Sequence, residues 1–157
     1  MKETELKIHI YGDQVLRKKS NPFKSVGDAE RAFADKMSKI MYTHGGIGLA
    51  APQVGVNKQL IIVDVGQGLF KLFNPKVIKK QGSSVIEEGC LSVPGIRALV
   101  PRYRSVKVTY QNSEAQACQM ILQDFPARVF QHEYDHLQGL VYLDRVESNR
   151  DIVSESE

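Results

Sequence analysis

The stretch FQHEYDHLQG, residues 130–139, holds two histidines four positions apart with a glutamate directly after the first. On an α-helix, residues four apart lie on one face, so His132 and His136 can direct both imidazoles at a single metal ion. Glu133 lies about 100° further round the axis and can reach a water molecule at that ion. This HExxH pattern is typical of metal-dependent hydrolases, and the alternative is a chance match in which the histidines only pack or cap.

The residues around this motif predict the helix that carries it. Asp124 is positioned to cap its start, Pro126 suits a first helical turn and Gly139 supplies a stop, which allows about four turns. A second, amphipathic helix is predicted over residues 28–44, where apolar residues recur at helical spacing and Asp28 is the expected N-cap.

Three segments before the middle of the chain predict β-strands. Residues 6–11 are a short β-rich stretch, and residues 59–65 are a continuous apolar run of strand length. Residues 69–80 resemble a strand pair that is broken at Asn74 and Pro75.

A hairpin is predicted further along the chain. Residues 105–111 and 115–123 both alternate apolar and polar side chains, and the short polar segment between them suits a turn. The predicted fold class is therefore α+β, with antiparallel β-sheets packed around a central metal-binding helix and one N-terminal amphipathic helix.

Composition limits the class of protein. The chain has 157 residues, 42% apolar and 25% charged, and we expect a single domain over residues 1–157. Its net charge of +3 is too balanced for nucleic acid to be the main ligand. No apolar stretch is long enough to cross a bilayer, and the N-terminus lacks the character of a signal or transit peptide. We predict a cytoplasmic protein, or an organellar one if this is a processed mature form.

The two histidines account for two metal ligands, and the sequence offers more than one candidate for the third. Tyr142 stands where some zinc proteases have a third histidine, and tyrosine is a poor replacement. Glu147 is the downstream candidate, but it lies in a polar tail close behind the helix. Cys90, within EEGCLSVPG (residues 87–95), is the upstream candidate, because one thiolate with two imidazoles leaves a fourth position for water.

A further segment, GGIGLAAPQVG (residues 45–55), is rich in glycine and alanine. It lacks the GK[ST] ending of a phosphate-binding loop and the spacing of a dinucleotide-binding one. Small residues let a backbone approach a ligand closely, and Gln53 offers a side-chain amide to a developing oxyanion.

Taken together, three segments resemble the peptide deformylase family. Its GxGxAAxQ, EGCxS and HExxDH motifs stand here as GIGLAAPQ (residues 46–53), EGCLS (residues 88–92) and HEYDH (residues 132–136), in that order. The resemblance covers nearly the whole chain. It implies a metal-dependent hydrolase that removes the N-formyl group from the initiator methionine of nascent polypeptides and releases formate.

The same resemblance assigns the metal and its ligands. It implies that Cys90, His132 and His136 bind the metal, which is expected to be Fe(II), with Zn(II) or Ni(II) able to substitute at a soft thiolate site. It also implies that Glu133 is the general acid and base. Gln53 and the backbone amide of Leu91 are expected to hold the oxyanion.

Neighbouring residues are expected to bind the substrate or support the metal site. Arg128 is expected at the rim of the methionine pocket rather than inside it. Asp135 is expected to orient a histidine, with a solvent-facing acid as the alternative, and Glu88 is expected to pair with Arg102 and brace the Cys90 segment. The pocket itself is expected to be lined by residues close to the three motifs, namely Ile47, Gly48, Ile86, Phe125 and Val129.

Partners and rival functions follow from the same residues. N-formyl-methionyl nascent peptides are the expected partners of a monomer, with at most transient contact with the ribosome, because the acidic end of the chain, residues 144–157, is not a basic docking helix. One rival is a zinc endopeptidase, against which the EGCLS segment counts. The other is a deformylase-like protein that binds metal or peptide without turnover.

Overall fold

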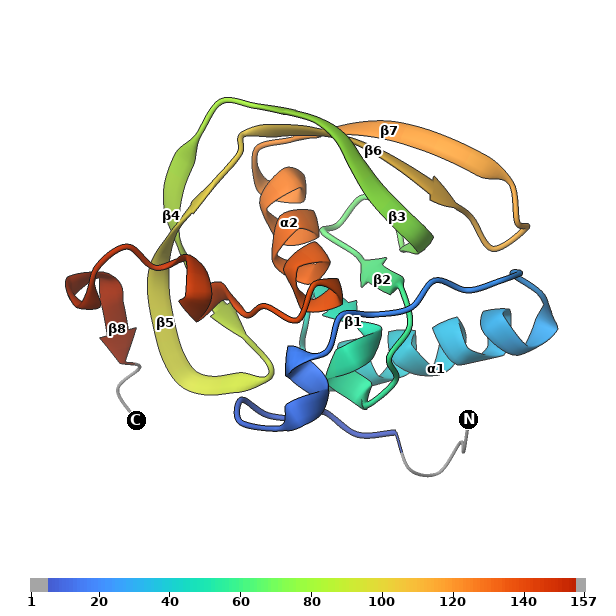
Figure 1. Ribbon diagram of the computed structural model, residues 1–157, viewed down its shortest axis with the longest axis horizontal. Helices are drawn as coiled ribbons and strands as arrows, with labels where there is room; N and C mark the ends of the chain where they lie inside the picture. The colour runs from blue at the N-terminus through green and yellow to red at the C-terminus, as the bar shows by residue number, and fades with distance from the viewer. Residues whose placement is uncertain (1–5, 155–157) are drawn as a thin grey trace.

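The computed structural model describes residues 6–154 and confirms the α+β class, with antiparallel sheets around a central helix (Figure 1). Within this part of the chain, the α-helices are α1 (Asp28–Thr43) and α2 (Phe125–Leu137), and the strands are β1 (Gly48–Ala50), β2 (Leu60–Val63), β3 (Phe70–Gln81), β4 (Ser84–Cys90), β5 (Val93–Arg102), β6 (Ser105–Gln111), β7 (Ala117–Gln123) and β8 (Ile152–Ser154).

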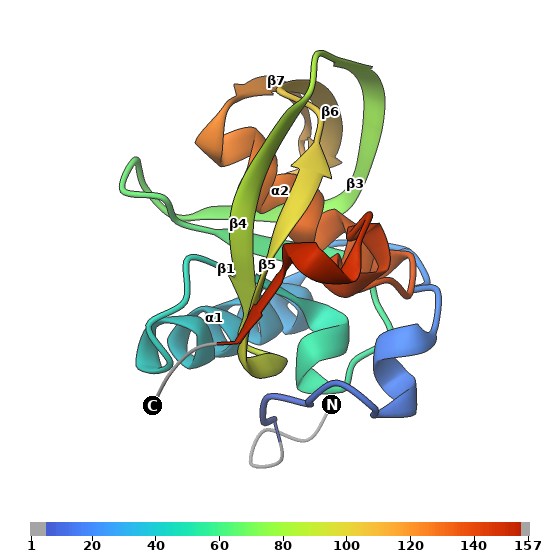
Figure 2. The ribbon, with the colours of Figure 1, turned by 90° about the vertical axis from the view of Figure 1, so that its left-hand side faces the viewer.

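Two sheets hold these strands. The larger has the order β1-β2-β3-β6-β7 and the smaller the order β4-β5-β8, with antiparallel neighbours throughout. The chain passes from one sheet to the other where β3 ends and β4 begins. Figures 1 and 2 show α2 between the two sheets, so residues on this helix can contact both.

Helix α2 lies at the centre of the fold, and most of its residues are buried. Ala127, Phe130 and Leu137 pack in one apolar cluster with Val106 and Val108 of β6. Burial of such side chains is the main favourable contribution to folding. The polar residues of the HExxH motif therefore lie inside the protein, where they need specific partners.

Gly139 ends this helix, as predicted. Its φ of 80° lies in the left-handed region that glycine adopts without strain. A Cβ at this position would also lie 2.6 Å from the carbonyl oxygen of Arg17, so a larger residue has no room.

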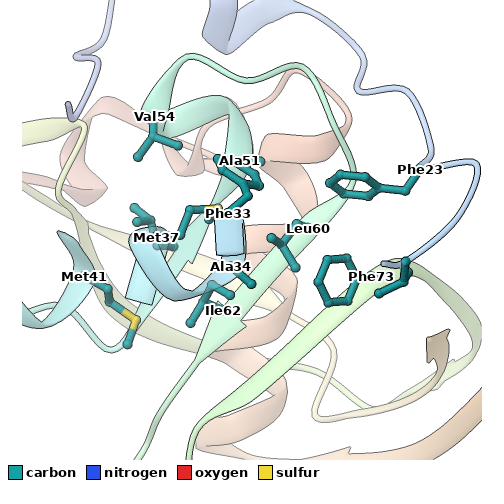
Figure 3. Packing of buried hydrophobic residues seen from close by; sticks show 12 residues of the cluster. Phe23, Phe33, Ala34, Met37, Met41, Ala51, Val54, Leu60, Ile62 and Phe73 are labelled. Carbon is teal, nitrogen blue, oxygen red and sulfur yellow. The ribbon is translucent and has the colours of Figure 1, made fainter. Parts of the chain in front are cut away.

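Helix α1 covers the other side of the larger sheet. Phe33, Met37 and Met41 lie on its buried face and pack against Leu60 and Ile62 of β2 (Figure 3). This spacing of three and four residues is the pattern that predicted an amphipathic helix.

The N-cap of α1 differs by one residue from the prediction. Gly27 is the N-cap, and its backbone N–H donates to the Glu30 carboxylate at 2.8 Å. Asp28 instead binds Arg31 within the first turn at 2.6 Å. Glu30 thus supplies the one side-chain hydrogen bond of a capping box, because Gly27 has no side chain to supply the other.

Residues 6–11 do not form the predicted strand. The N–H of His9 donates to the carbonyl of Gln53 at 2.7 Å, and that of Tyr11 donates to the carbonyl of Ser92 at 2.6 Å. The segment therefore bridges two separate parts of the fold and does not pair with one strand. Its β-rich composition cannot distinguish these two arrangements.

Strand β3 is continuous where a break was predicted. Asn74 has a φ of 52°, and the pairing of β3 with β6 shifts register between Phe73 and Lys76. The Asn74 side chain accepts from Phe23 N–H at 2.8 Å and donates to the Phe23 carbonyl at 2.9 Å. A β-bulge thus absorbs the asparagine and proline without ending the strand.

The hairpin of β6 and β7 is as predicted, with Ser105 opposite Gln123 and Gln111 opposite Ala117. The sheet formed by β4 and β5 was not predicted from residues 84–102. No helix among residues 6–154 is long and apolar enough to cross a membrane.

Candidate metal centre

The three predicted metal ligands lie together where β4 meets α2. Cys90 is the last residue of β4, and His132 and His136 lie one turn apart on α2. Their candidate ligand atoms all lie within 4.8 Å of one another, and Cys90 Sγ lies 3.5 Å from His136 Nε2. Both histidines are buried and the cysteine is half-buried. One metal ion can be held by this group, and a thiolate with two imidazoles suits a transition metal.

A tight turn and a buried amide hold the cysteine in position. The register of β4 and β5 shifts after Glu88, so that Cys90 pairs with Val93. Gln53 lies against this turn: its Nε2 donates to Ser92 Oγ at 3.1 Å and lies 3.5 Å from Cys90 Sγ. The Gln53 Oε1 accepts from Ala50 N–H at 2.9 Å, which fixes the amide orientation.

Glu88, on β4, orients His132 on α2. Its Oε1 accepts from His132 Nδ1 at 2.8 Å, and Arg102 donates to both carboxylate oxygens at 3.0 Å. A proton held on Nδ1 leaves the Nε2 lone pair of His132 free for a metal. The predicted pair of Glu88 with Arg102 is present, and the contact of Glu88 with His132 was not predicted.

Asp135 does not orient a histidine, contrary to the prediction. Its carboxylate accepts from Arg102 Nη1 at 2.5 Å and from Arg145 at 2.9 and 3.1 Å. On a helix, adjacent residues point in directions about 100° apart, so Asp135 faces away from the side that His136 presents to Cys90. Among the contacts of Asp135 within residues 6–154, the one with Arg102 connects it to Glu88 and so to the site.

Glu88 is expected to make the fold sensitive to acid. Burial raises the pKa of this carboxyl, but hydrogen bonds from His132 and Arg102 outweigh burial and lower the pKa from 4.5 to about 2. Because the folded pKa is below the unfolded one, ionised Glu88 stabilises the fold above the unfolded pKa by about 3 kcal/mol, and this contribution is lost as the pH falls through the folded value.

Urea unfolding from neutral pH to about pH 3 should show this decrease in the free energy of unfolding. In the same range, ¹³C NMR of glutamate-labelled protein should show one side-chain carboxyl that stays ionised after the exposed glutamates have become protonated. Carboxyl signals that all titrate together would contradict the prediction.

The two histidines differ in their affinity for a proton. Burial lowers the pKa of His136 well below its usual value, so its imidazole is neutral and has a lone pair to offer. Burial acts on His132 in the same direction, but the charge of Glu133 and hydrogen bonds to Cys90 and Glu88 raise the pKa of His132 well above its usual value. The acidic groups around His132 thus favour a positive charge at that residue, whereas His136 offers a neutral imidazole.

A cavity of about 570 Å³ opens beside the three ligands. Gln53, Cys90, Leu91, His132 and Glu133 all contribute to its wall. The five predicted substrate-binding residues also line it, with three of them partly exposed and two buried: Ile47, Ile86 and Phe125, then Gly48 and Val129.

Glu133 is the buried acid of this cavity. Its side chain is 5% exposed, and its Oε1 has no hydrogen-bond partner among the described residues. Burial raises the pKa of Glu133 to about 7 despite the opposing effect of His132. A carboxyl with this pKa can both accept and donate a proton near neutral pH.

Arg128 lines the cavity, but as a buried side chain and not at an open rim as predicted. Its side chain is buried, and its guanidinium donates to Glu88, to the carbonyl of Val100 and to Ser84. The residues next to Arg128 in the sequence, an alanine and a valine, do not indicate that it is buried in a hydrogen-bond network. Its partner Glu88 lies far away in the sequence. Ser92 was missed for the same reason, although its hydroxyl accepts from Gln53.

The sequence profile of the family described as polypeptide deformylase matches residues 5–151. The chain belongs to the polypeptide deformylase family. This confirms the resemblance drawn from the three motifs, and peptide deformylases are metalloenzymes.

Curated relatives are similar over most of the chain. The peptide deformylase of Halothermothrix orenii is 44% identical over 143 residues, which cover 90% of this chain and 93% of the relative. That of Thermotoga neapolitana is 40% identical over 141 residues, which cover 89% and 86%.

Solved structures agree with the fold. A peptide deformylase from Synechococcus elongatus, in complex with actinonin, has a TM-score of 0.90 at 39% identity and covers 93% of this chain and 81% of that one. The Thermotoga maritima enzyme has a TM-score of 0.89 at 38% identity and covers 91% and 98%. Peptide deformylases remove the N-formyl group from nascent peptides, so the chain is a hydrolase with this activity.

Proposed function

We propose that this deformylase holds its metal through Cys90, His132 and His136 and uses Glu133 as its general acid and base. The observation that carries the proposal is the convergence of three ligand atoms within 4.8 Å beside the buried Glu133 carboxylate, whose Oε1 has no hydrogen-bond partner among residues 6–154. We further propose Fe(II) as the native metal, with Zn(II) or Ni(II) as substitutes, because all three accept thiolate and imidazole ligands.

When bound, such a metal polarises the formyl carbonyl and makes water a stronger nucleophile. Glu133 accepts the proton of the attacking water and delivers it to the leaving amine, which yields formate and a free amino terminus. The pKa of Glu133, about 7, supports both halves of this transfer.

Gln53 and Leu91 are proposed to stabilise the oxyanion that develops on the formyl oxygen. The Gln53 amide is held by Ala50 and Ser92 and lies next to Cys90 on the cavity wall. Donors that are oriented before the reaction stabilise developing charge without reorganising. The methionine side chain is proposed to lie against Ile86, Phe125 and Val129 in the same cavity.

The proposal is tested by formate release. We expect the purified chain, loaded anaerobically with Fe(II), to release formate from a formyl-methionyl peptide and to leave its internal peptide bonds intact. Cleavage of an internal bond would select the endopeptidase instead. Metal binding without formate release would select the non-catalytic binding protein.

Gly48→Ala is expected to lower kcat/KM by about 10–100-fold, because it displaces the catalytic carboxylate. A Cβ at this position would lie 2.7 Å from Glu133 Oε2 and 3.0 Å from Val129 Cγ1. Formate release and metal content should be measured together, since the metal ligands are untouched. Gly27→Ala is the control, because its Cβ would meet only Glu30, at 3.4 Å. Equal activity of Gly48→Ala and the parent would contradict the prediction that a Cβ at residue 48 displaces the Glu133 carboxylate.

A further inference from the structure

Arg128 is a buried charged residue near the centre to which the proposed chemistry gives no role. Its side chain is 4% exposed, although it carries a full positive charge. Nη1 donates to Glu88 Oε2 at 2.5 Å and to the Val100 carbonyl at 2.9 Å. Nη2 donates to the carbonyl and the hydroxyl of Ser84, both at 3.0 Å. One guanidinium thus makes four contacts on two strands.

The position of these contacts matters because the metal ligands come from two different elements. Cys90 ends β4, whereas His132 and His136 lie on α2. Arg128 also lies on α2, and its partners Ser84 and Glu88 are on β4 and Val100 is on β5. The arginine therefore ties the strand that carries the thiolate to the helix that carries the imidazoles.

Glu88 connects Arg128 to the proposed metal ligand His132. One of its oxygens accepts from Arg128, and the other accepts from His132 Nδ1 at 2.8 Å. Arg102 contacts both oxygens. The carboxylate would keep Arg102 as a positive partner without Arg128, but of its two donors on α2 only His132 would remain.

We infer that Arg128 is a positioning residue of the metal centre, which sets Glu88 and the Cys90 strand against α2 so that His132 presents Nε2 toward the thiolate. This inference rests on the metal site proposed above. A planar guanidinium can satisfy four acceptors at fixed angles, whereas a lysine ammonium in this place can reach only some of them. Loss of a group that orients a metal ligand typically weakens metal binding by about 10–100-fold.

The test compares three variants of the full chain. Arg128→Met removes the four hydrogen bonds but keeps most of the apolar volume, and Arg128→Lys keeps the charge with fewer donors. Gln131→Met is the matched control. Gln131 is also buried on α2, and it accepts from Tyr103 N–H at 2.9 Å and donates to its carbonyl at 2.8 Å, so it ties the helix to the end of β5 without contacting Glu88.

Zn(II) affinity should be measured by competition with a chromophoric chelator, at a temperature at which circular dichroism shows each variant folded. We expect Arg128→Met to bind Zn(II) about 10–100-fold more weakly than the parent, Arg128→Lys to be intermediate, and Gln131→Met to match the parent. In the zinc-loaded protein, the proton NMR signal of His132 Nδ1–H should shift in both Arg128 variants and not in Gln131→Met.

Two outcomes would overturn the inference. One is parental Zn(II) affinity in Arg128→Met, or in Arg128→Lys if the methionine variant does not fold. The other is an equal loss in Gln131→Met, which would make the effect one of general stability. If Cys90→Ala leaves Zn(II) affinity unchanged, the proposed metal site fails instead, which is a separate result.

Discussion

Replacing Glu133 with glutamine is expected to lower kcat/KM for a formyl-methionyl peptide by about 10²–10⁴-fold while the metal stays bound. Glutamine has nearly the same shape and fits the space beside Gly48 that the carboxyl occupies. It cannot accept a proton from water or deliver one to the amine. The loss should therefore fall on the chemical step and not on folding.

The pH profile gives a second readout for Glu133. Burial raises the pKa of this carboxyl to about 7, and the ionised form is the base, so the rate of the parent should fall as the pH drops through that region. A metal cation close by favours the ionised form and moves this limb toward lower pH. The limb should be absent in Glu133→Gln.

Metal content and formate release should be measured on the same sample. Glu114→Gln, in the turn between β6 and β7, is a control for loss of one carboxylate far from the cavity. Formate release by Glu133→Gln at the parental rate would remove Glu133 from the mechanism. Loss of metal in this variant would instead mean that Glu133 supports the ligands.

The second large effect is expected from Cys90→Ala. Structural zinc sites with four ligands bind with roughly 10–16 kcal/mol, so loss of one ligand should weaken metal binding by about 10²–10³-fold and remove activity at low metal concentration. Cys118→Ala is the matched control, because Cys118 is the other free thiol and lies on β7.

Thiol reactivity tests the same site without a mutation. Metal should protect one of the two cysteines of the parent from a thiol reagent, and a chelator should expose it. Equal reactivity with and without metal would contradict ligation by Cys90. Retention of metal by Cys90→Ala would point to a different third ligand.

Local signals in the sequence were sufficient for several parts of the fold. The helix around His132 carries a proline in its first turn, a glycine stop and apolar residues that face the core. The β6–β7 hairpin has two alternating runs around a short turn. Such features depend on residues within a few positions of each other, so they can be read without knowledge of the tertiary fold.

Other parts were outside the reach of local patterns. The segment around His9 has the composition of a strand but bonds to two distant residues, Gln53 and Ser92. Asn74 and Pro75 resemble a strand end, yet the Asn74 side chain bonds to Phe23 and the strand continues. In both cases, partners more than 40 residues away in the sequence decide the backbone path, and no local rule contains them.

The predictions about domain extent, oligomeric state, partners and location also depend on more than the fold. The single domain over residues 1–157, the monomeric state, transient ribosome contact and a cytoplasmic location stay predictions.

The sequence by itself determined the family and the residues that meet at the site, because three motifs and the spacing of four between His132 and His136 mark the residues proposed as ligands and proton carrier without any tertiary contact. Only the tertiary structure decided how those residues are held. The acid that faces a histidine is Glu88 and not Asp135, because a carboxylate on a neighbouring strand can meet the imidazole while the adjacent residue on the helix points away. Arg128 is buried for the same reason, since its acceptors come from two strands that only folding brings to α2.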